Sequence, residues 1–202
     1  MQQIIHIHGG SAFDSYEQYL FSLENFIEFS PEKKEKKKKW KERYEEFLGE
    51  ENYQILRPCF PCSDNAKFRE WKMYFEKVLP YIEENCIIVA HSLGGIFITK
   101  YLSENTFPKT ISGLHLVAPL YSHTSQVEQI GDFRLADNWE QSFAKNSIKK
   151  IFLYHSTDDT ICPVEESKKY HEKLPQSKLQ IFADRFHFIG EDFPELFENI
   201  QR

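Results

Sequence analysis

The chain has 202 residues, a net charge of −6 at pH 7 and a hydrophobic content of 41%. This length suits a single domain with a sizeable core, and the composition excludes a disordered chain. The acidic charge balance argues against a nucleic-acid partner, and no apolar run approaches the roughly 18 residues that a membrane span needs.

The chain begins with MQQIIHIHGG, which lacks the basic and long apolar segments of a signal peptide. We therefore expect a cytoplasmic protein without a membrane partner.

Apolar residues follow two alternating patterns along the chain. Short runs rich in β-branched and aromatic residues predict strands, and apolar residues at helical spacing predict helices. The predicted strands cover Gln3 to His8, Tyr53 to Arg57, Ile87 to Ala90, Ile111 to Ala118, Lys150 to His155 and Lys178 to Phe182. The predicted helices cover Asp14 to Phe29, Asp64 to Ile82, Ile96 to Leu102, Trp139 to Ala144, Glu165 to Leu174 and Phe193 to Ile200. This alternation predicts one α/β domain over residues 1–202, with a parallel sheet covered on both faces.

A cluster of lysines lies between Lys33 and Lys39 and leads into Trp40. Such a cluster can mark a nucleic-acid or membrane surface. Glutamates follow on the same predicted helix, however, and favour a solvated face with charge pairs four residues apart. We therefore predict a helical basic insertion at about residues 31–49, ended by Gly49 as a C-cap.

Two of the four cysteines, Cys59 and Cys62, form a C-x-x-C after the second predicted strand. The spacing suits a redox pair. No other thioredoxin-like feature accompanies it, and no second Cys or His pair completes a zinc site. We favour a plain loop and expect no metal.

The run from Ile87 to Ile98, IIVAHSLGGIFI, contains a candidate nucleophile. A buried strand stops at Ala90, Ser92 follows, and a helical pattern begins after Gly94. Ser92 then lies on a sharp turn from strand to helix, where bulky residues two positions away would collide with the adjoining elements. A serine on such a turn can act as a nucleophile. The alternative is an ordinary serine N-cap.

Further candidates lie at the ends of later strands. Asp158 and Asp159 follow the fifth predicted strand, and His187 follows the last, within Phe-His-Phe. A serine nucleophile needs an imidazole to take its proton and a carboxylate to orient that imidazole. The alternatives are aspartates that only shape a turn and a buried structural histidine.

Four segments together resemble the motifs of the α/β-hydrolase superfamily. They are His8-Gly9-Gly10, Ala90-His-Ser92-Leu-Gly-Gly95, Ser156-Thr-Asp-Asp159 and Phe186-His187-Phe188. More narrowly, the chain looks like the small single-domain serine hydrolases of the retinoblastoma-binding-protein-nine type. The resemblance implies six strands in the spatial order 2-1-3-4-5-6 and a short cap segment at about residues 120–148. The basic insertion departs from the small members.

The resemblance also implies roles for the candidate residues. Ser92 would be the nucleophile and His187 the general base. Pro163, four positions after Asp159, matches the Asp-x-x-Val-Pro pattern that often carries the acid in this fold, so Asp159 is preferred to Asp158. The order Ser, Asp, His along the chain is the order of this superfamily.

The backbone N–H groups of Leu93 and Gly10 would form the oxyanion hole, with Ser11 as the second choice after Gly10. A plain glycine turn at Gly10 is the alternative. Tyr121 and His123, in the segment that would cover the site, are candidate substrate-binding residues, although aromatic side chains line cores equally often.

These features predict a serine hydrolase that cleaves an ester, thioester or amide bond through an acyl-enzyme, without a metal or organic cofactor. Its partner would be a small-molecule acyl substrate, whose identity the sequence leaves open, as it does the oligomeric state. The alternative is a catalytically silent binding module with the same fold, because a fold does not fix a function.

Overall fold

The computed structural model describes residues 1–27, 37–122 and 129–202. Its centre is a six-stranded sheet in the order β2-β1-β3-β4-β5-β6, in which every neighbouring pair is parallel. The strands are β1 (Gln2–Ile7), β2 (Tyr53–Leu56), β3 (Cys86–His91), β4 (Ile111–Val117), β5 (Ile151–Ser156) and β6 (Lys178–Phe182). The predicted sheet and its strand order are confirmed.

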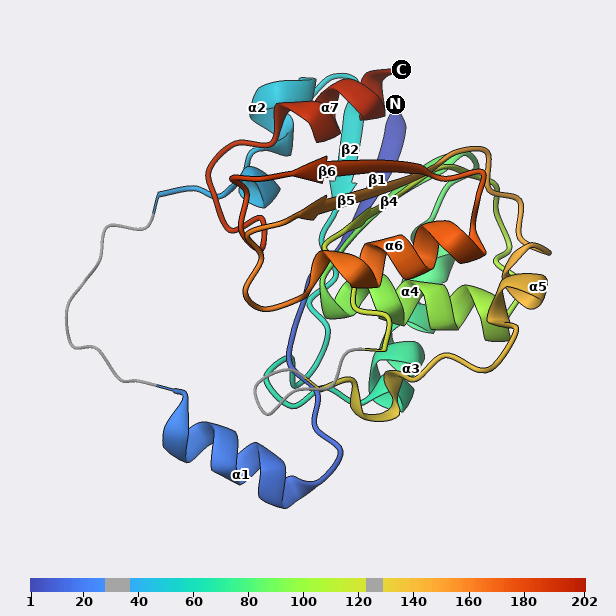
Figure 1. Ribbon diagram of the computed structural model, residues 1–202. Helices are drawn as coiled ribbons and strands as arrows, with labels where there is room; N and C mark the ends of the chain where they lie inside the picture. Colours follow the sequence, from blue (N-terminus) through green and yellow to red (C-terminus); the bar gives the residue numbers. More distant parts are fainter. Residues whose placement is uncertain (28–36, 123–128) are drawn as a thin grey trace.

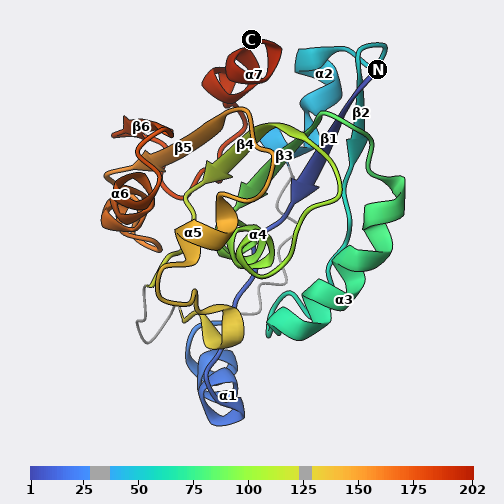
Figure 2. The ribbon, with the colours of Figure 1, turned by 90° about the vertical axis from the view of Figure 1, so that its right-hand side faces the viewer.

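Helices cover both faces of this sheet. The α-helices are α1 (Tyr16–Asn25), α2 (Tyr44–Leu48), α3 (Phe68–Val78), α4 (Leu93–Glu104), α5 (Trp139–Phe143), α6 (Val164–Lys173) and α7 (Pro194–Gln201). Short 3₁₀ turns are η1 (Trp40–Glu42), η2 (Leu79–Tyr81) and η3 (Gly131–Phe133). Helices α2 and α7 lie on one face of the sheet, and α3, α4 and α6 lie on the other (Figures 1 and 2).

The two faces bury separate apolar clusters. On one face, Trp71 of α3 and Phe97 of α4 pack against the central strands. On the other, Trp40 of η1 and Phe197 of α7 pack against the opposite sides of the same strands. Since β3 is buried along its whole length, the end of this strand is held from both sides, which fixes the turn that follows it.

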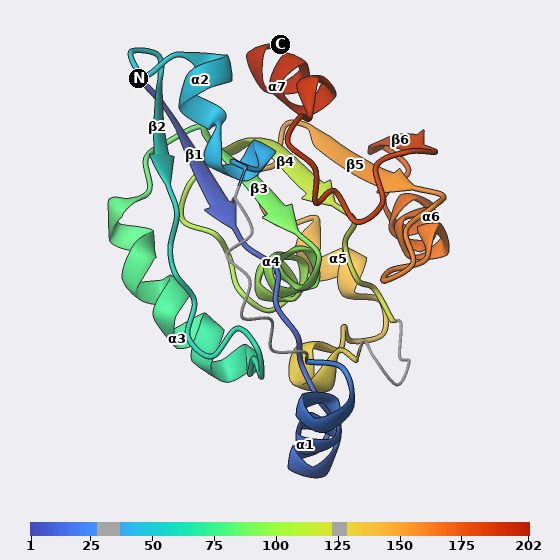
Figure 3. The ribbon, with the colours of Figure 1, turned by 90° about the vertical axis from the view of Figure 1, so that its left-hand side faces the viewer.

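Helix α1 begins as the sequence predicts, because Ser15 and Gln18 form a reciprocal capping box. It ends at Asn25 and not near Phe29. Its large apolar side chains are exposed, and Ser22 is its one buried residue. The helix extends away from the body of the molecule (Figures 1 and 3), so the helical periodicity is correct but the apolar face does not join the core.

The predicted helix at residues 31–49 is wrong in its extent. Residues 28–36 lie outside the described residues, and Lys37 to Lys39 are not helical. The chain instead forms the turn η1, followed by α2. Gly49 has a φ of 81° and its N–H bonds to the Glu45 carbonyl oxygen, so the predicted C-cap is confirmed.

The predicted cap segment contributes helix α5, which agrees with the expected short helix. Trp139 and Phe143 of α5 are buried. Asn146, just after α5, donates a hydrogen bond to the carbonyl oxygen of Leu102 near the C-terminal end of α4. Because Ser92 lies at the opposite end of α4, this part of the segment does not cover it. Residues 123–128 of this segment lie outside the described residues.

Across the three described ranges, no helix combines the length and the apolar character needed to cross a membrane.

Candidate active site

Ser92 lies on a strained turn between β3 and α4. Its φ is 54° and its ψ is −121°, a region that non-glycine residues rarely occupy. The Ser92 N–H bonds to the Val117 carbonyl oxygen at 2.9 Å, and the Gly95 N–H bonds to the Ser92 carbonyl oxygen at 2.8 Å. The turn is therefore held by the neighbouring strand β4 and by the first turn of α4.

Small residues around Ser92 allow close approach of the backbone. A Cβ on Gly94 would lie 2.5 Å from the carbonyl oxygen of His8, and a Cβ on Gly9 would lie 3.1 Å from Cβ of Ser92. Ala90, at the position where the superfamily pattern usually has glycine, is fully buried. The segment after β1 therefore packs directly against the Ser92 turn.

His187 is held by Asp159. The Nδ1 of His187 lies 2.7 Å from Oδ2 of Asp159. The other oxygen of this carboxylate accepts backbone N–H groups of Ile161 and Cys162, each at 2.9 Å. The carboxylate is fully buried and the imidazole nearly so, so neither group exchanges this partner freely for water.

Asp158 has a different set of partners. Its carboxylate accepts the Ser156 hydroxyl and, at 3.0 Å, the N–H of Phe186. It therefore shapes the loop before His187, and Asp159 is the aspartate that contacts the imidazole. Phe186 and Phe188, on either side of His187, both have positive φ, 47° and 52°. Backbone strain at bulky residues is typical of sites where a side chain must be held in one direction.

A second histidine, His155, contacts Asp159. Burial by itself would raise the pKa of Asp159, but contacts with His155 and His187 outweigh it and hold this pKa well below its usual range. Nε2 of His155 lies 2.7 Å from the Cys162 carbonyl oxygen and 3.5 Å from Oδ2 of Asp159. Since both neighbours only accept, Nε2 carries the proton, and Nδ1 accepts from the Ser167 hydroxyl at 2.7 Å.

His91, one residue before Ser92, contacts the backbone of His187. Its Nε2 donates to the His187 carbonyl oxygen at 2.9 Å. Burial lowers the pKa of His91 well below its ordinary value, and the nearby His187 adds to the effect, so His91 is a neutral donor. The sequence does not predict this contact of His91, because a residue that faces the core gives no signal for a backbone partner 96 positions away.

Ser92 and His187 line one pocket, of about 460 Å³, at the carboxyl ends of the strands. Gly10 and Ser63 also line it. The Ser11 N–H is already bonded to the Ser63 carbonyl oxygen at 2.8 Å, which disfavours it as an oxyanion donor. Leu93 is the first residue of α4, so its N–H has no acceptor within the helix.

The loop that carries Gly10 is fixed by His8. Its Nε2 accepts the N–H of Phe60 at 3.0 Å, and its Nδ1 donates to the Gly9 carbonyl oxygen at 2.6 Å. Burial lowers the pKa of His8, in agreement with a neutral ring that accepts through Nε2. A Cβ on Gly10 would lie 2.4 Å from the Ser63 carbonyl oxygen, so only glycine fits there.

One of the two predicted substrate-binding residues, Tyr121, does not line this pocket. Tyr121 lines a separate cavity of about 640 Å³ beside α5, and its hydroxyl accepts the indole N–H of Trp139 at 3.2 Å. His123 lies outside the described residues. Tyr121 is therefore not part of the described lining of the Ser92 pocket, and substrate binding by Tyr121 and His123 stays a prediction.

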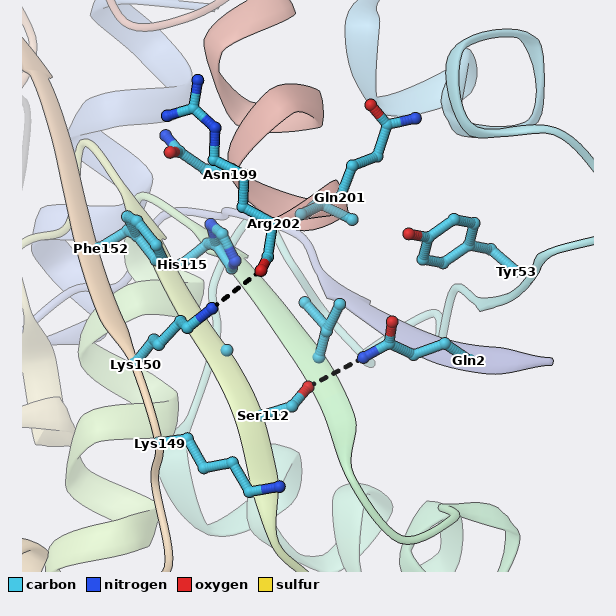
Figure 4. Close-up of a pocket in the computed structure, with 13 residues that line it drawn as sticks. Gln2, Tyr53, Ser112, His115, Lys149, Lys150, Phe152, Asn199, Gln201 and Arg202 are labelled. Carbon is cyan, nitrogen blue, oxygen red and sulfur yellow. Dashed lines mark hydrogen bonds between the residues drawn. The ribbon is translucent and has the colours of Figure 1, made fainter.

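Another cavity, of about 300 Å³, lies at the opposite end of the sheet. Figure 4 shows Lys150 bonded to the carbonyl oxygen of Arg202 and Gln2 bonded to Ser112 on its wall. None of the residues that line this cavity lines the Ser92 pocket.

The two cysteines of the C-x-x-C, Cys59 and Cys62, are exposed and not bonded to each other. Within the described ranges, no cluster of His, Cys, Asp and Glu could hold a metal ion.

The parallel sheet, the serine on a sharp turn after β3 and the histidine after β6 together define an α/β-hydrolase fold. A family model described as serine hydrolase matches residues 33–190, and the chain belongs to this family. It is therefore a hydrolase. The narrower resemblance to the retinoblastoma-binding-protein-nine type stays a prediction.

Solved structures share this fold. The ydeN gene product of B. subtilis is 19% identical, with a TM-score of 0.78 over 100% of this chain and 97% of that one. A YdeN-like hydrolase from Pectobacterium atrosepticum is 15% identical, with a TM-score of 0.63 over 98% and 89%. The serine hydrolase CCSP0084 from Cycloclasticus zankles is 14% identical, with a TM-score of 0.63 over 100% and 88%. No curated protein matches the chain.

Proposed function

We propose that the chain is a carboxylesterase-like enzyme that cleaves an ester, thioester or amide bond of a small acyl substrate, with Ser92, Asp159 and His187 as its catalytic triad. The observation that carries the proposal is the position of Ser92 on its strained turn, in one pocket with a His187 ring bonded to Asp159. The esterase domain from a Rhodothermus marinus protein and Est1E from Butyrivibrio proteoclasticus share the fold, which is compatible with this chemistry.

The reaction begins with proton transfer. Because Nδ1 of His187 faces Asp159, Nε2 is the ring nitrogen left to take the proton of the Ser92 hydroxyl. The Ser92 oxygen then forms a bond to the substrate carbonyl carbon, and the carbonyl electrons move to its oxygen. When the tetrahedral intermediate collapses, the bond to the leaving group breaks and His187 returns its proton to that group.

Water completes the cycle. His187 takes one proton from water as the hydroxide adds to the acyl carbon, and it returns that proton to Ser92 when the acid leaves. Backbone N–H groups of Leu93 and Gly10 are our candidates for the donors to the oxyanion. A donor of this kind contributes about 3 kcal/mol to the transition state in a known serine protease. Asp159 keeps the His187 ring in the tautomer that accepts at Nε2.

The test is covalent labelling with a fluorophosphonate, followed by mass spectrometry of the labelled peptide. We expect the label on Ser92 and none on the Ser92→Ala variant, which should also lose hydrolysis of p-nitrophenyl esters. Ser63, which lines the same pocket, provides the matched control, since Ser63→Ala should still be labelled at Ser92. Labelling of the Ser92→Ala variant at an unchanged rate would exclude Ser92 as the nucleophile.

A wild-type protein that neither reacts with the fluorophosphonate nor hydrolyses any ester would contradict the proposal and favour the non-catalytic binding module.

A further inference from the structure

Lys41 brings a positive charge into the Ser92 pocket. It belongs to η1, outside the segments that form the proposed triad, and it lines the pocket together with Ser92 and His187. Its side chain is partly buried. Lys41 is the one formally charged Lys, Arg, Asp or Glu among the residues that line this pocket in the described ranges.

The neighbouring residue Trp40 fixes the position of Lys41. The indole N–H of Trp40 bonds to the Phe188 carbonyl oxygen at 2.7 Å, and the Trp40 backbone N–H bonds to the Gly190 carbonyl oxygen at 3.3 Å. Trp40 is almost completely buried. The turn that carries Lys41 is therefore attached to the loop that carries His187, and the backbone of Lys41 is held beside the pocket.

Nearby carboxylates are engaged elsewhere. Glu42 accepts the backbone N–H of Lys39 at 2.9 Å, and its charge acts on Lys41 without forming an ion pair. Glu45 forms a two-point pair with Arg57 at 2.7 and 2.8 Å, and Glu46 pairs with two other cations. Among the ion pairs formed by the described residues, none includes the Lys41 ammonium. A cation at a pocket wall without a carboxylate partner favours an anionic ligand.

The electrostatic surroundings agree with this interpretation. Burial, then the positive charge of Lys39, lower the pKa of Lys41, and the negative charge of Glu42 offsets only part of this lowering. A bound anion would therefore stabilise the charged form of Lys41. The charge of Lys41 also contributes, after burial, to the lowered pKa values of His8 and His91. The ammonium therefore acts within electrostatic reach of the two neutral imidazoles that flank the pocket.

We propose that Lys41 is a specificity-determining residue that binds an anionic group of the substrate, so that the enzyme prefers esters carrying a negative charge near the scissile bond. The proposal rests on the proposed function and names its substrate class. Since one ammonium recognises a carboxylate at either end of the substrate equally well, the anionic group can belong to the acyl part or to the leaving group.

Matched esters separate these cases. The first pair is 4-nitrophenyl hydrogen succinate and its methyl ester, which differ in a charge on the acyl part. The second pair is the acetate ester of 4-hydroxybenzoate and that of methyl 4-hydroxybenzoate, which differ in a charge on the leaving group. A charge-assisted contact predicts that kcat/KM for the charged member of at least one pair exceeds that of its neutral partner by roughly tenfold.

Lys41→Gln should abolish that preference, and Lys41→Arg should retain most of it. Lys38→Gln is the control for net charge, because Lys38 is exposed and pairs with Glu46 outside the pocket. Raising the salt concentration should reduce the wild-type preference without any mutation. Equal kcat/KM for charged and neutral esters in the wild type, or an unchanged preference in Lys41→Gln, would overturn the inference.

Equilibrium binding separates this inference from the proposed function. Monomethyl succinate should bind the Ser92→Ala variant more tightly than dimethyl succinate does, and the added Lys41→Gln change should remove the difference. If the wild type showed no esterase activity but this difference in binding were observed, the anion site would stand and only the hydrolytic proposal would be rejected. Equal binding of the two compounds to Ser92→Ala would reject the anion site, whatever the activity of the wild type.

Discussion

The indole N–H of Trp40 donates a hydrogen bond of 2.7 Å to the carbonyl oxygen of Phe188, although 148 positions separate the two residues. Phe188 directly follows His187. The bond thus connects the turn that presents Lys41 with the loop that presents the proposed general base. Trp40 also packs against Phe193 and His91. One buried side chain therefore contacts the loop after His187 and the residue before Ser92.

We therefore predict that Trp40→Phe lowers the free energy of unfolding by about 1–3 kcal/mol, because the Phe188 carbonyl oxygen loses its buried donor. Esterase kcat should fall as well, since the His187 loop loses a support. Chemical denaturation and steady-state kinetics measure the two effects. Phe47→Leu, at a partly exposed position on α2, is the control and should leave kcat unchanged. An unaltered kcat in Trp40→Phe would show that the loop does not depend on this bond.

Asp159→Asn should reduce kcat by about 10⁴-fold with little change in structure. The amide can still accept the two backbone N–H groups through its oxygen, which turns its NH₂ toward His187. The ring then accepts at Nδ1 and carries its proton on Nε2, where it cannot take the proton of Ser92.

Asp158→Asn is the matched control for this prediction, because an amide oxygen can replace the carboxylate as acceptor for Ser156 and Phe186. We expect its kcat to stay within a few-fold of the wild type. If the two variants lose activity in the opposite order, Asp158 is the functional acid.

Gly94→Ala should destabilise the protein by about 1–3 kcal/mol and impair catalysis. Its new methyl group would lie 2.5 Å from the His8 carbonyl oxygen and 2.8 Å from that of Ile7. Both contacts are with backbone, so the segment carrying Gly10 must move away from Ser92.

Gly190→Ala provides the comparison for the Gly94 change, because a methyl group there meets no atom within 4 Å. Thermal unfolding of both variants should show a loss for Gly94→Ala only. Equal melting temperatures would mean that the turn can adapt to a side chain.

The protein should lose stability as the pH falls below about 6.5. Burial lowers the pKa of His6 and of His115 to about 3. Between these values the unfolded chain binds protons that the folded chain does not, so the free energy of unfolding decreases by about 1.4 kcal/mol per pH unit for each histidine.

Denaturant unfolding between pH 4 and 7 measures how the free energy of unfolding depends on pH. In His115→Gln, the slope of this dependence should be smaller by the contribution of one histidine. A His115→Gln slope equal to that of the wild type would contradict the assignment.

Local pattern was sufficient for the central strands. The β-branched run before Ala90 predicts β3, and the small residues around Ser92 predict the turn after it, as observed. The pattern of α1 was equally clear, yet its apolar face is exposed. Helical periodicity indicates that a helix can bury one face, but it does not show which part of the chain will cover that face.

By itself, the sequence determined the alternation of strands and helices and the candidates Ser92, Asp159 and His187, because these depend on residue spacing and on motifs of neighbouring residues. Only the tertiary structure showed the bond from Asp159 to His187, where the resemblance had given a preference over Asp158. It also placed Tyr121 at a separate cavity and Lys41 at the Ser92 pocket. These outcomes depend on contacts between residues far apart in the chain. Such contacts are set by packing and buried hydrogen bonds, which leave no periodic signal in the sequence.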